Sequence, residues 1–250
     1  MPTNHGLLRE KEMIAALDSK KVSELSNNMR HLLEELYGVL DENEIVKCLA
    51  PDDYYKPDFF IIYRGIKKGI SMKSGRSNIV HSELVNNFIE YLRELNVSEK
   101  TLETILLYHF GDGTTDGSGS ERFEFAKLHY LLDNRIKEAN DELNSDIDRI
   151  YQVLERCVFA GAKEEFPRAD ALYHGDVSFG VVATEKQVRK HIYRKNWKWM
   201  DALHIGPLML RPHARYIGVE IASEKRRHTI ECHWSNLAAD IAYISKRYDN

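Results

Sequence analysis

The sequence predicts an α/β fold, in which a mixed central sheet is flanked by helices and followed by a β-rich C-terminal portion. Residues 7–19 and 22–38 repeat apolar side chains with the spacing of amphipathic helices. Residues 58–63 and 69–73 are short apolar runs around a basic turn, a pattern typical of a hairpin. From about residue 158, short strand-like runs alternate with glycine, proline and charged turns. The 250 residues are therefore expected to form one α/β domain.

More helices are expected between the hairpin and the strand-rich end. Residues 80–95 carry an apolar stripe at helical spacing, and Ser82 is expected to be the N-cap. Ser98 should cap the next helix in the same way. The other predicted helices are residues 98–110, 121–139, 145–157 and 235–247. The predicted strand-like runs are residues 157–162, 177–184, 203–212, 215–223 and 228–234.

The composition is that of a folded protein of the cytoplasm. Hydrophobic residues make up 43% and charged residues 30% of the chain, which excludes a disordered protein. No apolar run approaches the roughly 20 residues that cross a bilayer, and the N-terminus carries charges where a signal peptide needs an apolar core. Cys48, Cys157 and Cys232 form no CxxC pair, so we expect buried free thiols in a reducing compartment.

The charges are distributed unevenly along the chain. Residues 186–250 contain 13 Lys and Arg against 6 Asp and Glu, a balance of +7 that leaves −11 on the first 185 residues. The run 186–198 has six basic residues and no acidic one, and residues 225–228 form a second cluster. A basic end on an acidic body indicates a polyanionic partner, although a solvated helix face would give the same run of charges.

The most informative stretch is residues 56–75, which places Asp58 and Lys73 on neighbouring strands. Side chains alternate along a strand, so Ser71 and Lys73 point to the same face. Desolvating a lysine beside a carboxylate at the edge of a core costs folding free energy, so such a pair indicates a function. We expect this function to be phosphodiester hydrolysis, with Asp58 binding Mg²⁺ and Lys73 holding the attacking water or a phosphate oxygen.

One carboxylate is a thin ligand set for a hard cation, and Ser71 cannot supply a second. Glu83, expected in the first turn of the following helix, is the main candidate for the second metal ligand. A glutamate that merely complements the helix dipole would look the same. Glu34 and Glu35 on the preceding helix are the alternatives. His81 and His109 flank the site, and each is more often a structural residue than a catalytic base. The role of the glycine-rich loop 111–120 stays open.

Asp58 after Pro57, followed by Ser71-Met72-Lys73, resembles the PD-(D/E)XK nuclease signature with serine at the variable acid. Some type II restriction endonucleases of this superfamily take the missing acid from the next helix, as Glu83 would here. The order of elements along most of the chain is similar to that of restriction enzymes of the MspI kind. It includes the "YHFGDG" loop and a basic end with paired strands.

The resemblance implies a restriction-endonuclease-like core at about 20–185 and a basic DNA-contacting portion at about 186–250. It implies a Mg²⁺-dependent, sequence-specific endonuclease that acts on double-stranded DNA. Its partners would include a methyltransferase of the same target site, and a homodimer is one arrangement that a palindromic target allows. The residues expected to contact DNA are Arg76, Lys190, Arg194, Lys195, Arg211, His213 and Arg215. Two alternatives remain: a repair or junction-resolving nuclease on the same core, and a non-catalytic nucleic-acid-binding protein.

Overall fold

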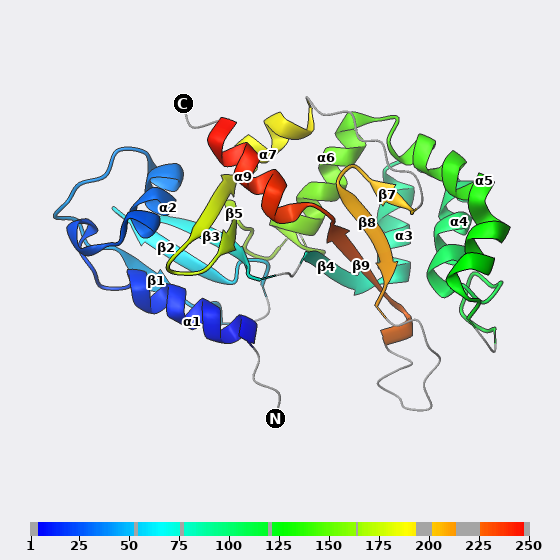
Figure 1. The fold of residues 1–250 in the computed structure, drawn as a ribbon, viewed down its shortest axis with the longest axis horizontal. Helices are drawn as coiled ribbons and strands as arrows, with labels where there is room; N and C mark the ends of the chain where they lie inside the picture. The colour runs from blue at the N-terminus through cyan, green and yellow to red at the C-terminus, as the bar shows by residue number, and fades with distance from the viewer. Residues whose placement is uncertain are drawn as a thin grey trace. The chain divides into compact units, whose positions relative to one another are not determined.

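The computed structural model describes residues 5–52, 55–75, 78–119, 122–163, 165–193, 202–213 and 226–247. It confirms the α/β class, with a mixed five-stranded sheet, a separate antiparallel sheet of four strands, and helices flanking both (Figure 1). The chain folds into two compact units, each assembled from separated segments. The first unit comprises Met1–Asn78, Glu155–Arg194 and Asn236–Asn250, and the second comprises Ile79–Leu154 and Lys195–Ser235.

The sheet of the first unit is mixed because a single pair of its strands is parallel. β3 and β5 run parallel, whereas the other neighbouring strands are antiparallel. The strand order is β1 (Lys47–Leu49), β2 (Phe59–Tyr63), β3 (Ile66–Lys73), β5 (Ala171–Gly175) and β6 (Gly180–Thr184). The predicted hairpin is therefore confirmed as β2 and β3. Arg64 and Gly65 both have positive φ, 50° and 76°, which suits the tight two-residue turn between twisted strands.

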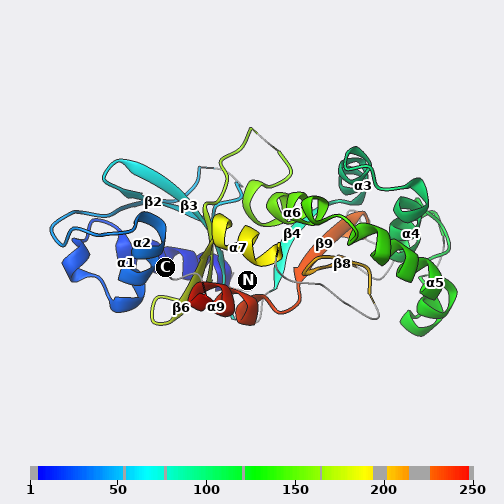
Figure 2. The same cartoon turned by 90° about the horizontal axis from the view of Figure 1, so that it is seen from above.

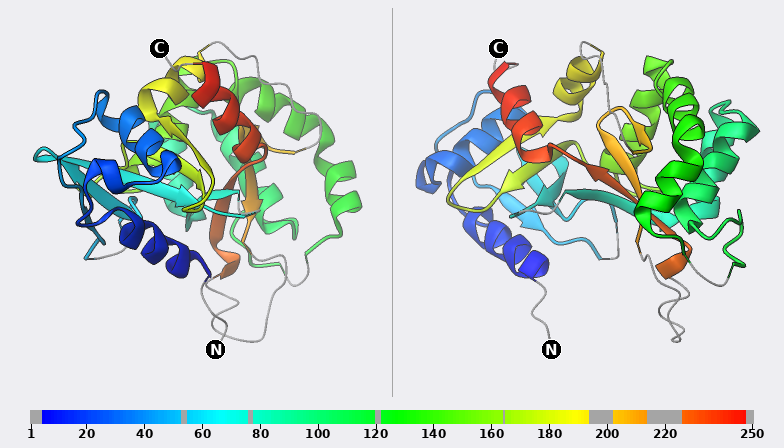
Figure 3. Two further views of the ribbon diagram at one scale, coloured as in Figure 1. Left: turned by 60° about the vertical axis from the view of Figure 1, so that its left-hand side comes forward. Right: turned by 45° about the vertical axis from the view of Figure 1, so that its right-hand side comes forward.

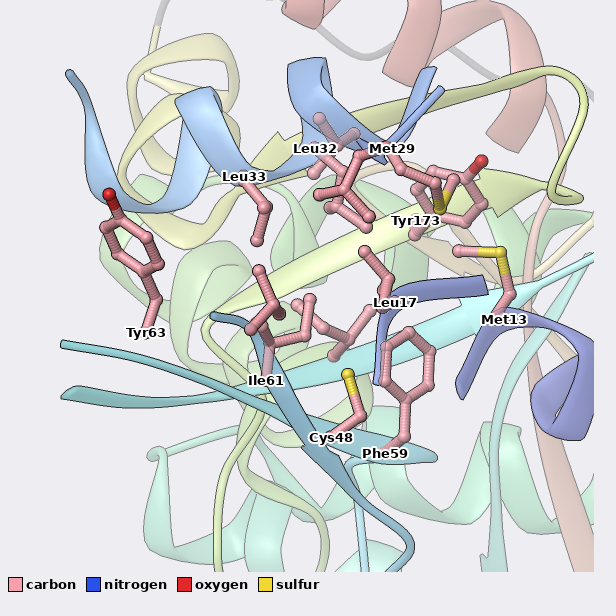
Figure 4. Packing of buried hydrophobic residues seen from close by; sticks show 14 of the residues in the cluster. Met13, Leu17, Met29, Leu32, Leu33, Cys48, Phe59, Ile61, Tyr63 and Tyr173 are labelled. Atoms are coloured by element: carbon pink, nitrogen blue, oxygen red, sulfur yellow. The ribbon is translucent and has the colours of Figure 1, made fainter. Parts of the chain in front are cut away.

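The helices of the first unit are α1 (His5–Leu17), a 3₁₀ turn (Val22–Glu24), α2 (Asn27–Tyr37), a π-helical turn (Arg156–Ala160), α7 (Glu185–Ile192) and α9 (Leu237–Arg247). Of these, α1 and α2 cover one face of the sheet. Met13 and Leu17 of α1 join Met29 of α2 in one apolar cluster with Phe59 and Ile61 of β2 (Figure 4). Helix α9 lies beside α7 and β6 (Figure 2). Burying this face fixes α1 against the hairpin that carries the candidate site.

The second unit pairs its strands in the order β4 (Ile79–Leu84), β9 (Thr229–Trp234), β8 (Leu208–Pro212) and β7 (His204–Ile205). Its helices are α3 (Val85–Glu94), α4 (Glu99–Phe110), α5 (Phe125–Leu143) and α6 (Ile147–Glu155). Helices α4 and α5 pack side by side, next to the β8–β9 pair (Figure 3). The Ser98 side chain accepts a hydrogen bond from the Thr101 amide, which confirms the predicted cap of α4.

The structure corrects two predicted elements. Residues 80–95 are not one helix, because Ile79–Leu84 form strand β4 and α3 begins only at Val85. Ser82 is therefore a strand residue, and Leu84 occupies the N-cap. The amphipathic spacing of α3 runs back into β4, but β4 instead pairs with β9, which is distant in sequence. The segment predicted as strand 157–162 lies mostly in the π-helical turn. The predicted run 215–223 lies outside the described residues.

Other expectations concern burial. Cys48, Cys157 and Cys232 are buried and free, as predicted. In the described ranges, the helices lack the length and apolar character needed to span a membrane.

Candidate functional site

Asp58 immediately precedes β2, and its carboxylate bonds to the neighbouring strand β3. Its backbone N–H donates to the Ile70 carbonyl at 2.8 Å. Its Oδ2 accepts a hydrogen bond from the Met72 amide at 2.5 Å. This bond places the carboxylate at the backbone between Ser71 and Lys73 of β3. The structure thus brings the three predicted residues of the hairpin together.

Strand β3 separates its two faces as its alternating pattern requires. Ile70 and Met72 belong to the apolar cluster under α1 and α2. Ser71 and Lys73 point away from that cluster. Ser71 is only 2% exposed, whereas Lys73, one alternation later at the end of the strand, is half-buried. At this end of β3, a ligand can therefore reach Lys73 but not Ser71.

A third charged residue at this place, Glu10 of α1, was not predicted from the sequence. Burial raises the pKa of the Glu10 carboxyl, the negative charge of Asp58 raises it further, and the positive charge of Lys73 opposes the shift. Glu10 therefore lies within electrostatic reach of both predicted catalytic residues. One signal could have revealed it: Glu10 precedes the buried Met13 and Leu17 by three and seven residues, so it shares the sheet-facing side of α1.

The structure describes where the three glutamates predicted as candidates for the second metal ligand lie and what Glu83 and Glu35 bond to. Glu83 is not in a helix but on β4 of the second unit, where its Oε1 is hydrogen-bonded to His81 Nε2 at 2.9 Å. Glu35 accepts a hydrogen bond from the Gln187 side chain at 2.7 Å, and Glu34 is exposed on α2. The charges of Asp58 and Lys73 both act on the pKa of Glu10.

The chemistry of this cluster suits a hard divalent cation. Asp58 keeps one carboxylate oxygen after bonding to Met72, and Glu10 adds a second carboxylate. Mg²⁺ prefers one or two carboxylates, together with water and substrate phosphate oxygens, over an all-protein cage. The described residues contain no group of three or more His, Cys, Asp and Glu able to hold a metal ion.

In the second unit, two of the residues predicted to contact DNA lie at the end of β8. Arg211 is exposed, and His213 follows the strand with its side chain 37% exposed. The Glu231 carboxylate accepts hydrogen bonds from both His213 Nδ1 and His233 Nε2. Burial acts to raise the pKa of Glu231, but the bonds to His233 and His213 bring it below its usual value. An ionised carboxylate therefore orients both imidazoles.

The predicted run of basic residues is described only in part. Lys190 is exposed on α7, whose Val188 and Ile192 are buried. Arg76, Arg194, Lys195 and Arg215 lie outside the described residues, so their predicted DNA contacts have no structural description.

The second basic cluster, 225–228, is partly structural. The Arg227 guanidinium bonds to Asp112 Oδ2 at 2.5 Å and to the Gly119 carbonyl at 3.1 Å. The side chains of Arg227 and Asp112 are 9% and 0% exposed. Burial alone would raise the pKa of Asp112, but bonds from Thr114 and the charge of Arg227 lower it. Arg227 therefore shapes the loop 111–119, whereas its neighbour Arg226 is exposed.

This buried pair gives a stability prediction. Arg227→Ala should lower the free energy of unfolding by about 3–5 kcal/mol, because it leaves the Asp112 charge buried and unpaired. The exposed neighbour supplies the matched control, since Arg226→Ala should change stability by no more than about 0.5 kcal/mol. Urea denaturation followed by circular dichroism measures both variants. Equal, small effects would mean that the pair does not stabilise the loop.

The two histidines that flank the site in the sequence, His81 and His109, both belong to the second unit. His109 in the second unit is 2% exposed, and its Nε2 donates to the Arg227 carbonyl at 2.8 Å. Burial, above all, lowers the pKa of His109 to about 4, so the ring is neutral at physiological pH. His81 is bonded to Glu83 in the same unit.

No model of a protein family matches the chain, and a search of curated proteins gave no match.

Proposed function

We propose that this protein is a Mg²⁺-dependent, sequence-specific endonuclease of double-stranded DNA, acting as a type II restriction enzyme. The observation that carries the proposal is the Asp58 carboxylate bonded to the backbone of β3 next to Lys73, with Glu10 of α1 within electrostatic reach of both. Two carboxylates and a lysine at this place are what metal-assisted phosphodiester hydrolysis requires. The serine at the variable acid position is compatible with it, because Glu10 offers the second carboxylate.

In this proposal each residue has a defined role. Asp58 and Glu10 hold the metal, which when bound polarises the scissile phosphate and lowers the pKa of its water. Lys73 orients the attacking water or a non-bridging phosphate oxygen, and its charge offsets the negative charge that develops during the reaction. The Met72 amide keeps the Asp58 carboxylate in place through its hydrogen bond. Ser71 is buried and small, so Ser71→Ala should change the rate far less than changes at Asp58 or Lys73.

The basic C-terminal third would hold the duplex. Exposed cations such as Lys190 suit contacts to the phosphate backbone, which give affinity without sequence information. Arg211 and His213, exposed at a strand end, suit contacts to base edges, and an arginine reads guanine O6 and N7.

The assignment of Lys190 gives a prediction about salt. If Lys190 neutralises one phosphate, Lys190→Ala should flatten the slope of log K against log[salt] by about 0.9. Fluorescence anisotropy with a labelled duplex, over a range of salt concentrations and without divalent metal, measures this slope. Lys137, exposed on α5 and paired with Asp133, is the control whose removal should leave the slope unchanged. An identical slope in Lys190→Ala would remove this residue from the DNA surface.

A cleavage assay tests the function itself. The purified protein is incubated with phage DNA and Mg²⁺, with EDTA as the control, and the products are separated on a gel. Discrete fragments that require Mg²⁺ are the expected result. Cuts selective for branched or damaged DNA would instead indicate a repair or junction-resolving nuclease. DNA binding without cleavage would indicate a non-catalytic nucleic-acid-binding protein.

A further inference from the structure

The strand next to Lys73 carries a histidine at the same level of the sheet. β3 and β5 are parallel, and their register pairs Ser71 with Leu172 and Lys73 with His174. Paired residues of neighbouring strands point to the same face, and neighbouring strands lie about 4.8 Å apart. The side chains of Lys73 and His174 therefore leave the sheet side by side, on the face opposite the apolar cluster.

On the face opposite the apolar cluster, the sheet becomes accessible to solvent at the Lys73–His174 pair. One layer inward, Leu172 is 0% and Ser71 2% exposed, so nothing polar can enter there. Lys73 and His174 are both half-buried. The next residue, Gly175, ends β5, pairs with Gly180 of β6 and carries no side chain. Lys73 and His174 are thus the last side chains of β3 and β5 on this face.

The backbone that carries His174 is held firmly from the core side. Tyr173, which points into the apolar cluster, donates from its hydroxyl to the Asp176 carbonyl at 2.6 Å. The Asn28 side chain donates to the Tyr173 hydroxyl at 2.8 Å and accepts from the Gly180 amide at 3.1 Å. These bonds tie the β5–β6 turn to α2. An imidazole on such a support needs little ordering when it binds a ligand.

In the part of the chain that the structure describes, the His174 ring makes no hydrogen bond. A neutral imidazole keeps one N–H donor and a protonated one has two. A phosphodiester presents two non-bridging oxygens, and the Lys73 ammonium is a point charge that does not fix their orientation. A second hydrogen-bond donor on the adjacent strand would fix the orientation of the phosphate oxygens.

We propose that His174 binds the same DNA phosphate as Lys73, donating an imidazole N–H to one of its non-bridging oxygens. The role rests on the proposed function, since the phosphate is the one to be cleaved. It concerns orientation of the substrate and assigns no proton transfer to the ring.

Two variants of similar size test the donor. His174→Gln keeps a side-chain N–H, whereas His174→Met has none. Single-turnover cleavage of phage DNA with Mg²⁺ should be about 10- to 100-fold slower for His174→Met, the loss expected for a hydrogen bond to a charged group. His174→Gln should recover most of the rate. Ser178→Ala, on the exposed turn of the same hairpin, should match the wild type. Thermal unfolding should be the same for all of them.

The outcomes separate the two proposals. If wild-type protein cuts and Lys73→Ala does not, but His174→Met cuts at the wild-type rate, the histidine has no role and the endonuclease function stands. Equal rates for His174→Met and His174→Gln, both reduced, would show that the N–H is not what matters and would also overturn the assignment. A wild-type protein that cuts no DNA would overturn the proposed function itself.

Discussion

Replacing Lys73 with alanine should lower the single-turnover rate of DNA cleavage by at least about 10² to 10³, the loss typical of one preorganised electrostatic group. Lys73 is half-buried at the end of β3, beside the Asp58 carboxylate that is bonded to the Met72 amide. A positive charge at this place acts on the charge that develops in the transition state. Binding of the intact duplex, measured without divalent metal, should change much less than the rate.

The same strand provides the control. Lys68 is also on β3, but its ammonium pairs with Asp170 at 2.9 Å, away from Asp58. Lys68→Ala should therefore cut at a rate close to the wild type. Asp58→Asn should be as inactive as Lys73→Ala, and it retains a side-chain oxygen that can accept the bond from Met72. Wild-type cleavage by Lys73→Ala would mean that the catalytic centre lies elsewhere in the chain.

The hairpin and its two catalytic candidates could be predicted because their signals are local. Alternating side chains set the faces of β3, and Arg64-Gly65 supplies the tight turn. The aspartate at the start of one strand and the lysine at the end of the next are then adjacent by geometry alone. No contact with a distant segment is needed to infer that.

The errors arose where distant segments decide the local structure. β4 carries the same apolar spacing as α3, but backbone pairing with β9 makes it a strand, and this moved Glu83 out of the predicted helix. In the sequence, Arg227 belongs to a basic cluster, but in the structure its guanidinium is bonded to Asp112 of a loop that is distant in sequence. In both cases the partner is far away in the sequence, so composition and periodicity do not reveal it.

Glu10 was missed for the same reason, since helix α1 reaches the hairpin only through tertiary packing. Its periodicity shows which side of α1 is apolar, but not against which strands that side packs. Met13 and Leu17 anchor α1 on β2 in the apolar cluster, and this anchoring carries Glu10 toward Asp58 and Lys73.

Glu10→Gln should weaken Mg²⁺ binding by at least about 10- to 100-fold, the range already seen when a residue that merely supports a metal ligand is lost. Isothermal titration of the protein with Mg²⁺ in the presence of duplex DNA, using a non-cleaving Lys73→Ala background, measures this affinity. Glu83→Gln and Glu35→Gln are matched controls. Their carboxylates are bonded to His81 and Gln187, so both variants should bind Mg²⁺ like the parent. A loss of affinity in Glu83→Gln alone would restore the ligand assignment made from the sequence.

The raised pKa of Glu10 adds a second, independent readout. In the folded protein without metal, burial and then the charge of Asp58 raise this pKa above its value in the unfolded chain. A carboxyl shifted in this direction stabilises the fold below the unfolded pKa, near pH 4, and that contribution is lost as the pH rises through the folded pKa. At neutral pH without metal, Glu10→Gln should therefore unfold at a higher temperature than the wild type, and the difference should vanish below about pH 4. Added Mg²⁺ should raise the unfolding temperature of the wild type more than that of the variant, because only the wild type offers both carboxylates. An unfolding temperature that Glu10→Gln leaves unchanged at neutral pH would mean that Glu10 does not share an electrostatic site with Asp58, and the second metal ligand would have to come from another residue.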